Sequence, residues 1–260
     1  MYHLQTTSES QEFDKISDYK VKRQKKNISI IIPTYKEEAL IGKLIDAISS
    51  QMIGLDYEIV VVDDSSPDNT SKEVIGRFGN TEEVVLLERK KRGVFSAQLD
   101  GTKVATGEIL VLMDADFSHP PQKIRELISV LNQFDIVSCS RFLKESKMIA
   151  PFTRKYSTIA FNYIIRILLN FGISDYTSIF FAVKRNSWEK LKFHYDSIWG
   201  EAGMEIFKQA RLNNLLIKEI PFIYNYREEG ESKADNYLKY AFVYMKRALQ
   251  VRFFYKNGTK

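Results

Sequence analysis

The chain has 260 residues, of which 44% are hydrophobic and 27% charged, so it is long and apolar enough to bury the core of one large domain. A single cysteine, Cys139, excludes a disulfide framework within the chain, and its apolar surroundings predict a small core residue. The formal net charge of +5 suits anionic partners such as nucleotides, lipid phosphates or an anionic membrane, but also a protein that is simply rich in lysine.

Residues 1–27 predict a flexible basic arm. They contain no apolar stretch of the kind found in signal peptides, and they end in the basic run Lys22–Lys26. This run is interpreted either as a solvated tail or as a weak contact with a membrane surface. The most apolar stretch, Ile159–Ile173, is too short to span a bilayer and contains Arg166. We therefore expect a chain that does not cross a membrane but can lie on one.

Strands and helices alternate regularly from residue 28 onward. Apolar runs and helical spacing predict strands at 28–32, 57–62, 84–87, 108–113 and 135–140, and helices at 41–52, 70–78, 93–105 and 121–134. This alternation predicts an α/β fold, a mostly parallel sheet with helices on both faces.

The second half of the sequence is less regular. Its patterns predict helices at 155–171 and 200–212, strands at 178–183 and 215–224, and a last helix rich in aromatic and basic residues. The predicted organisation is an arm over 1–27, an α/β domain over 28–233 and a C-terminal amphipathic helix over 234–260.

Three polar clusters follow predicted strands, at Pro33–Glu38, Asp63–Asn69 and Asp114–His119. Ligands of open α/β sheets bind in the crevice at the carboxyl ends of the strands. We expect the three clusters to converge there.

No G-x-G-x-x-G follows the first strand, and the chain has neither a P-loop nor a His/Cys zinc spacing, which argues against a dinucleotide site, a P-loop site or a zinc site.

Asp114-Ala-Asp116 is a D-x-D motif at a strand end. Two carboxylates at this spacing can share one Mg²⁺ or Mn²⁺ with a bound diphosphate, although a short acidic motif can also simply cap a helix. In the other clusters, an acidic side chain after the second strand can bond a base or a ribose, or shape a turn. Tyr35 can stack on a base, and Glu37 can bond a ribose.

Across residues 28–233, the chain resembles family 2 glycosyltransferases, and within them the dolichyl-phosphate mannosyltransferase (polyprenyl-phosphate glycosyltransferase) group. The matching strings, in chain order, are IIPTYKEE, VVDDSSPDNT, LMDADFSHPP, SRF, RKYSTIAFN, DYTS, MEIF and IKEIPFIYNYREEGESK.

The resemblance implies a GT-A type, Rossmann-like fold and a set of site residues. Nucleotide contacts are implied for Pro33, Tyr35, Glu37, Asp63, Asp64 and Asp114. Ligation of Mg²⁺ or Mn²⁺ is implied for Asp114, Asp116 and Ser118. Binding of the acceptor phosphate is implied for Arg141, Arg154, Thr158, Arg227 and Lys233, and the residues expected to act in catalysis are Asp116, Arg141 and Arg227.

The implied activity is metal-dependent, inverting transfer of a hexose, mannose or glucose, from GDP-mannose or UDP-glucose to dolichyl or polyprenyl phosphate. The expected location is the cytoplasm, peripheral on the cytoplasmic face of a membrane. The expected partners are the membrane surface and a membrane-anchored subunit, with no nucleic acid.

The sequence departs from the group where the sugar and the acceptor bind. The usual T-S-G-F-R reads Thr177–Phe181 here, and the usual aromatic-Gln-x-Glu reads Ala202–Glu205. Two alternatives stay open. The enzyme could glycosylate a hydroxyl, with Asp175, Glu201 or Glu205 as the base, or the chain could be an inert nucleotide-binding subunit.

Overall fold

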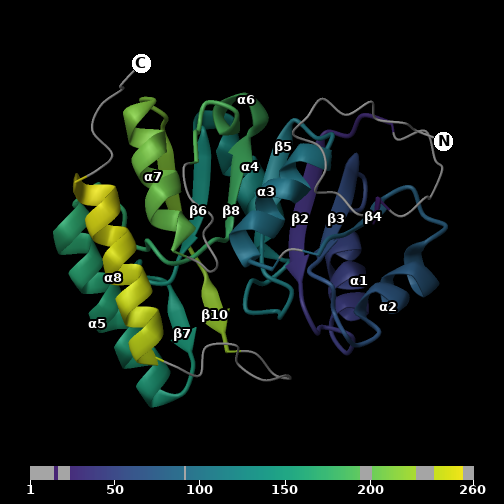
Figure 1. Ribbon diagram of the computed structural model, residues 1–260. Helices are drawn as coiled ribbons and strands as arrows, with labels where there is room; N and C mark the ends of the chain where they lie inside the picture. Colours follow the sequence, from purple (N-terminus) through teal and green to yellow (C-terminus); the bar gives the residue numbers. More distant parts are fainter. Residues whose placement is uncertain (1–14, 17–23, 91, 194–200, 227–236, 254–260) are drawn as a thin grey trace.

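The computed structural model places the chain around one eight-stranded sheet, in the order β1-β4-β3-β2-β5-β8-β6-β9 (Figure 1). The structure describes residues 15–16, 24–90, 92–193, 201–226 and 237–253. The strands are β1 (Lys15–Ile16), β2 (Ile28–Thr34), β3 (Tyr57–Asp63), β4 (Val84–Glu88), β5 (Ile109–Leu112), β6 (Ile136–Ser140), β8 (Phe181–Lys184) and β9 (Ile217–Pro221), with β7 (Lys147–Ile149) and β10 (Ile223–Asn225) forming a separate ribbon.

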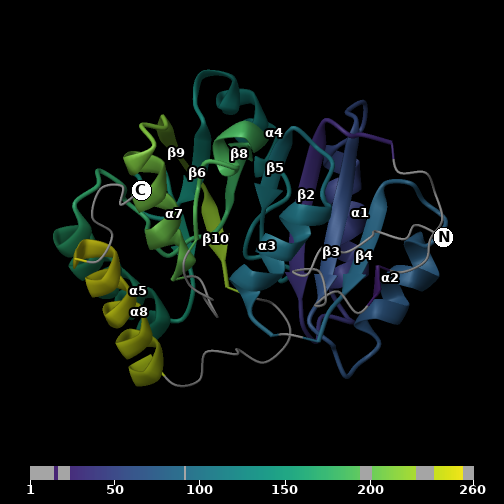
Figure 2. The ribbon, with the colours of Figure 1, turned by 45° about the horizontal axis from the view of Figure 1, so that its top comes forward.

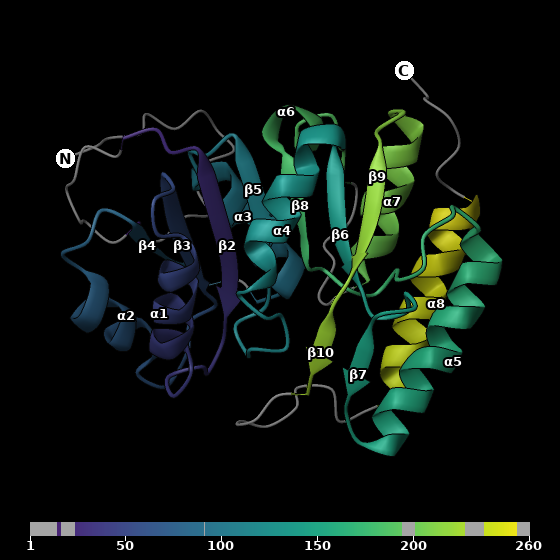
Figure 3. The ribbon, with the colours of Figure 1, turned by 180° about the vertical axis from the view of Figure 1, so that it is seen from behind.

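The helices cover the sheet in layers. They are α1 (Ile41–Gln51), α2 (Thr70–Phe78), α3 (Val94–Val104), α4 (Lys123–Val130), α5 (Phe152–Leu169), α6 (Arg185–Trp188), α7 (Ala202–Leu212) and α8 (Tyr237–Phe253). Helices α1, α2 and α4 pack on one face, seen from behind in Figure 3, and α3, α6 and α7 pack on the other. Because both faces are covered, β2 and β3 are almost fully buried, which explains their continuous apolar sequences.

Strand β2 pairs in parallel with both β3 and β5, β3 pairs in parallel with β4, and β6 pairs in parallel with β9. Strand β8 is antiparallel to both β5 and β6, and the short β1 is antiparallel to β4. The predicted mostly parallel sheet with helices on both faces is therefore confirmed. The reversed direction of β8 was not predicted, and it brings the segment before β8 to the same edge as the carboxyl ends of β5 and β6 (Figure 2).

The strand order places the crevice expected at the carboxyl edge at the boundary between β2 and β5. Strand β2 pairs with β3 as far as Thr34 and Asp63, whereas its pairing with β5 stops at Ile31 and Leu112. The chain runs outward from β2 to β3 and β4 and then returns to the other side of β2. The gap between β2 and β5 is therefore the topological switch point at which such sheets bind ligands.

The strand predicted at 215–224 is two strands. Strand β9 ends at Pro221, Phe222 is buried, and β10 leaves the main sheet to pair in parallel with β7. Figure 1 shows this ribbon projecting from the main sheet beside the helix pair α5 and α8, which lie side by side at one end of the molecule. Neither β7 nor the ribbon was predicted.

Part of the segment expected to be a flexible arm contacts the domain. Lys15 and Ile16 pair with the outer edge of β4. Lys25 lies 2.5 Å from Glu108, and Lys26 lies 3.3 Å from Asp56. The two lysine contacts are at the amino ends of β5 and β3, at the edge of the sheet opposite the expected crevice, so the described end of the basic run faces acidic residues of its own domain.

Arg89 connects the carboxyl ends of β3 and β4 to the start of α3. Its side chain is only 1% exposed and bonds Asp64 at 2.5 and 3.2 Å and Asp100 at 2.9 Å. It also donates to the carbonyl of Gly93, whose φ of 143° favours glycine, and to the hydroxyl of Ser96. The guanidinium therefore holds three elements together beneath the crevice.

Replacing Arg89 with alanine should strongly destabilise the fold. Asp64 and Asp100 would lose their partner in a buried setting, and removal of one member of such a network costs about 3–5 kcal/mol. Urea unfolding followed by circular dichroism measures this loss. Arg77 is the matched control, because it also contacts two acidic residues but is well exposed, so Arg77→Ala should change stability little. Equal losses in the two variants would contradict the structural role of Arg89.

Candidate active site

The loop after β5 carries the D-x-D motif at the crevice. Asp114 and Asp116 are partly exposed, while Ala115 between them is buried. The Asp116 carboxylate accepts a hydrogen bond from the backbone N–H of Ser118 at 3.1 Å, and Phe117 has a left-handed φ of 59°. This tight turn holds both carboxylates at the open edge of the sheet. Ser118, also predicted as a metal ligand, is 3% exposed.

His119 supports this loop from below. Its ring is buried and stacks on Phe180 at 4.7 Å. Its Nδ1 accepts the backbone N–H of Asp114 at 2.9 Å, which leaves Nε2 as the protonated nitrogen of the neutral ring, 3.7 Å from the Asp114 carboxylate. Burial lowers the pKa of His119, in spite of the opposing effect of the Asp114 and Asp116 carboxylates. A neutral His119 therefore supports the fold of the loop rather than acting as a base.

Two carboxylates can hold a divalent cation here only with help from other ligands. Within the described residues, no group of three or more His, Cys, Asp or Glu side chains is arranged to bind a metal ion. Mg²⁺ and Mn²⁺ readily take one or two carboxylates and complete their shell with phosphate oxygens and water. The partly exposed pair Asp114 and Asp116 fits that mode of binding.

Tyr35, just after β2, and Arg92, just before α3, contact each other on the β2 side of the switch point. Tyr35 is partly exposed, and the guanidinium of Arg92 lies 4.1 Å from its ring centre and donates to its hydroxyl. Pro33 is partly exposed at the end of β2, whereas Glu37 is 7% exposed, and its backbone N–H is bonded to Thr70. Arg92 belongs to no motif noticed in the sequence, so sequence reasoning missed its contact with Tyr35.

Asp63 and Asp64 are both engaged inside the protein. Asp63 is 1% exposed and accepts hydrogen bonds from the hydroxyls of Thr34 and Ser71 and from both the backbone and the side chain of Ser66. Asp64 is committed to Arg89 and to the backbone N–H of Gly93. The structure thus places both carboxylates under the loop that borders the crevice, where they determine its shape.

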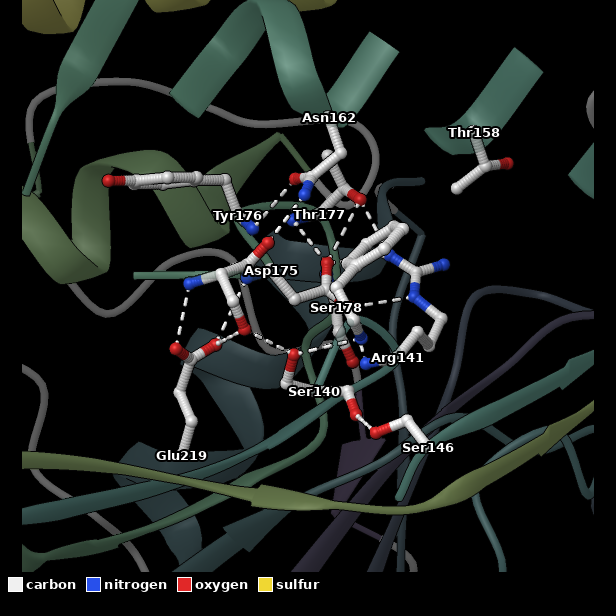
Figure 4. Close-up of polar contacts among 12 residues, drawn as sticks. Ser140, Arg141, Ser146, Thr158, Asn162, Asp175, Tyr176, Thr177, Ser178 and Glu219 are labelled. Carbon is white, nitrogen blue, oxygen red and sulfur yellow. Dashed lines mark hydrogen bonds and ion pairs between the residues drawn. The ribbon is translucent and has the colours of Figure 1, made fainter. Parts of the chain in front are cut away.

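Arg141 follows β6 and forms a two-pronged ion pair with Asp175 (Figure 4). Nε lies 2.7 Å from one carboxylate oxygen and Nη2 lies 2.8 Å from the other. Nη2 also donates to Thr177 at 2.6 Å. Asp175 is 0% exposed, and the Arg141 side chain is 11% exposed. Among the described residues, Nη1 of Arg141 has no hydrogen-bond partner, so one edge of the guanidinium can still bind an anion.

The ion pair is charged at neutral pH. Burial by itself would raise the pKa of Asp175, but the adjacent Arg141 guanidinium and several N–H donors hold it below its ordinary value. Burial opposes the charge on Arg141 as well, and Asp175 outweighs that effect and raises its pKa. The pair therefore provides a fixed guanidinium at the end of β6. In the sheet, the single strand β8 separates β6 from β5, which carries the D-x-D loop.

Tyr224 in β10 lies near the end of β6. Its ring centre is 5.5 Å from the Arg141 guanidinium. Burial raises the pKa of its hydroxyl, and the charges that act on it include the cations Arg141 and Arg154 and the anions Asp116 and Asp114. The hydroxyl of Tyr224 is therefore within electrostatic reach of both the D-x-D loop and the basic side of the site. Sequence reasoning missed it, because one tyrosine in a strand carries no motif.

The remaining predicted site residues are on α5 or beyond the described residues. Arg154 and Thr158 are partly exposed in the first two turns of α5, and the Thr158 hydroxyl donates to the Arg154 carbonyl at 2.7 Å. Arg227 and Lys233 lie outside the described residues. The charges of Asp114, Asp116, Arg141 and Arg154 thus all act on the hydroxyl of Tyr224.

Two curated relatives carry the same name. A dolichol-phosphate mannosyltransferase of Pyrococcus furiosus is 35% identical over 228 residues, which cover 84% of this chain. The chain spans only 64% of that relative's length. A dolichol-phosphate mannosyltransferase of Mycosarcoma maydis is 28% identical over 241 residues, covering 89% of this chain and 80% of the relative.

The fold also matches a solved structure, glucosyl-3-phosphoglycerate synthase from Mycobacterium tuberculosis. The TM-score is 0.67 at 18% identity, covering 87% of this chain and 80% of the other, which confirms the predicted GT-A type of fold. The sequence profile described as "Glycosyl transferase family 2" matches residues 29–192, from β2 to beyond α6. Since that match includes the switch-point crevice, the D-x-D loop and the Arg141 ion pair, the chain belongs to glycosyl transferase family 2.

Proposed function

We propose that this chain transfers a hexose from a nucleotide-sugar to a polyprenyl phosphate, with inversion at the anomeric carbon and with help from Mg²⁺ or Mn²⁺. The observation that carries the proposal is that the D-x-D loop after β5 and the ion-paired guanidinium of Arg141 after β6 lie at the same carboxyl edge of the sheet, with only β8 between these two strands. A diphosphate held through a cation on one side and a phosphate monoester held by guanidinium groups on the other would meet at this edge.

The donor side rests on Asp114 and Asp116. A bound divalent cation would offset the charge that develops on the leaving diphosphate. The solved relative was crystallised with Mn²⁺ and uridine diphosphate, and also with Mg²⁺ and uridine diphosphate, which supports this use of the two carboxylates. Tyr35, Pro33 and the loop shaped by Asp63 would bind the nucleoside, with Arg92 against the Tyr35 ring.

The acceptor side rests on Arg141 and Arg154. A phosphate monoester is largely dianionic at neutral pH, so it needs fixed cations more than it needs a base. Arg141 offers Nη1, Arg154 offers a second guanidinium, and Thr158, Arg227 and Lys233 are proposed to complete the site. Both named curated relatives favour mannose and dolichol phosphate, so we propose GDP-mannose ahead of UDP-glucose as the donor.

Transfer to a hydroxyl is less well supported. It would need a base near the reacting carbon, and the candidates named from the sequence are all buried. Asp175 is ion-paired with Arg141, and Glu201 and Glu205 are 3% and 0% exposed. The lowered pKa of Asp175 makes its ion-paired carboxylate a weak proton acceptor.

We further propose that α5 rests on the cytoplasmic face of a membrane. Among the described residues, no helix combines the length and the apolar character needed to cross a bilayer. Helix α5 nevertheless exposes an apolar stripe whose members recur every three or four residues and so share one side of the helix. The stripe consists of Phe152, Tyr156, Ile159, Tyr163 and Ile167, which are 74%, 51%, 38%, 61% and 65% exposed.

Neighbouring elements expose apolar side chains as well. Ile149 and Ile223, on the β7–β10 ribbon, are 58% and 45% exposed, and Phe242 and Phe253 of α8 are exposed as well. Lys155 lies beside the stripe on α5, where it could meet lipid phosphates, whereas Arg154 is on the opposite side of the helix. A surface of this kind would bring the acceptor lipid to α5, the helix that carries Arg154. The alternative occupant of this surface is a membrane-anchored partner subunit. The vesicle-binding test below distinguishes such a partner from a membrane.

Removal of the Asp116 carboxylate should abolish metal-dependent donor binding. In Asp116→Ala, the diphosphate charge would lose much of its compensation, so transfer should fall roughly 100-fold or more. Calorimetry with the nucleotide and Mn²⁺, together with a radiolabelled transfer assay, measures both effects. Glu126→Ala is the control, because Glu126 is exposed on α4 and is paired with Lys123 in the part of the chain that the structure describes. Full activity of the Asp116 variant, or of the wild type in EDTA, would refute the metal assignment.

Arg154→Ala should raise the KM for polyprenyl phosphate about tenfold and leave donor affinity unchanged, since the proposal assigns Arg154 to the acceptor phosphate alone. Arg154→Lys should recover part of the loss, because lysine keeps the charge but not the two-pronged geometry. Arg166→Ala is the matched control, an exposed arginine three turns further along α5. A change in donor KM, or the same effect from Arg166→Ala, would argue against the assignment.

Charges placed in the stripe should weaken membrane binding. The double variant Tyr163→Glu and Ile167→Glu should bind anionic vesicles of phosphatidylglycerol and phosphatidylcholine far less in cosedimentation, because carboxylates resist burial among acyl chains. It should still act on a short, water-soluble prenyl phosphate. Ile53→Glu with Leu55→Glu is the control pair, exposed in the connection between α1 and β3. Absence of vesicle binding by the wild type would assign the stripe to a protein partner instead.

A further inference from the structure

The segment that carries Asp175 is held by side chains rather than by strand pairing. Residues 174–178 precede β8 and take no part in its ladder. Glu219 in β9 accepts hydrogen bonds from the backbone and the hydroxyl of Ser174, at 2.7 and 2.8 Å, and from the backbone of Asp175 at 3.0 Å. The Ser174 hydroxyl also contacts that of Ser140 at 2.6 Å. These bonds fix the segment from the side of the sheet.

Asn162 in α5 fixes the same segment from the opposite side, as Figure 4 shows. Its side-chain nitrogen donates to the carbonyl of Ser174, and its side-chain oxygen accepts the backbone N–H of Tyr176 at 3.1 Å. The two backbone groups lie on either side of Asp175 in the chain. A primary amide is needed for this arrangement, because one short side chain must both donate and accept.

The surroundings of Asn162 offer no other explanation for a polar residue. It is 2% exposed, and the other buried residues on its helix, Ile165 and Leu169, are apolar. A buried amide is costly unless it is hydrogen-bonded, and both of these bonds go to the segment around Asp175. Asn162 therefore serves that segment and not α5 itself.

We propose that Asn162 is a positioning residue for Arg141, acting through Asp175. By holding the backbone on either side of Asp175, it fixes the carboxylate that orients the Arg141 guanidinium. Asn162 lies one turn after Thr158 and about two turns after Arg154 on α5. The same amide thus sets the separation of the two acceptor-side cations, Arg141 and Arg154.

This role is useful because two cations bind one phosphate well only at a set spacing. Arg154 moves with α5, whereas Arg141 belongs to the end of β6. Without a link, a small shift of α5 would change the distance between them, and misplacement of this kind can cost a large factor in rate. The inference rests on the proposed function in one respect, that Arg141 and Arg154 face the acceptor phosphate.

Asn162→Leu removes both hydrogen bonds with little change in volume. We expect kcat/KM for polyprenyl phosphate to fall roughly tenfold or more while the Kd for the nucleotide stays unchanged. Asn162→Gln, which keeps the amide, should recover part of the loss. The control is Leu169→Ala, on the same buried face of α5, which should lower stability through a cavity without changing the acceptor KM. Wild-type kcat/KM in Asn162→Leu would overturn the proposal.

A double-mutant cycle separates positioning from simple destabilisation. If Asn162 acts through Arg141, the variant carrying both Asn162→Leu and Arg141→Lys should be little worse than Arg141→Lys alone. Additive losses would overturn the proposal.

A second measurement does not depend on activity. The Nε–H of Arg141, bonded to Asp175 at 2.7 Å, should exchange slowly with water in NMR spectra of the wild type and faster in Asn162→Leu. Its resonance is assigned by its loss in Arg141→Lys. Identical exchange in the two proteins would overturn the proposal. If the wild type transfers no sugar to polyprenyl phosphate but the exchange rate responds to Asn162→Leu, the proposed function fails and the positioning role stands.

Discussion

The ion pair between Arg141 and Asp175 is the interaction on which the basic half of the site depends. A buried ion pair is stable only when hydrogen bonds from the protein supplement the attraction between its two charges and satisfy the remaining polar atoms of both groups. Asp175 meets that demand with backbone N–H groups of Thr177 and Ser178 besides the guanidinium. Those groups reach it only because β8 begins at this edge of the sheet. The ion pair therefore depends on the reversed direction of β8.

The first half of the fold was predictable because its signals are local. Strands such as β2 and β3 are buried on both faces and stand out as apolar runs, and helices α1, α2 and α4 show helical spacing. The direction of β8 left no trace in the sequence, because period and propensity are the same for parallel and antiparallel strands. The break at Phe222 was missed for a related reason, since an apolar run continues through it while the chain leaves one sheet for another.

The site was predictable where a motif coincides with a strand end, and less so elsewhere. Asp114 and Asp116 lie at the crevice as expected. Asp63 and Asp64 look equivalent to them in sequence, but their partners, Ser71 and Arg89, are 8 and 25 residues away and turn both carboxylates inward. Arg92 and Tyr224 gain their importance only from three-dimensional neighbours, so single-sequence patterns could not identify them.

The two halves of the site come from two separate stretches of the sequence. The described residues assigned to the nucleotide side, from Pro33 to Asp116, come before α4, whereas Arg141, Asp175, Asn162 and Tyr224 all come after it. The helix α4 thus separates two stretches of sequence that can diverge independently. Hybrid chains joined within α4 would inherit their nucleotide crevice from one parent and the surroundings of Arg141 from the other, which makes this helix the natural crossover point for exchanging acceptor preference between relatives.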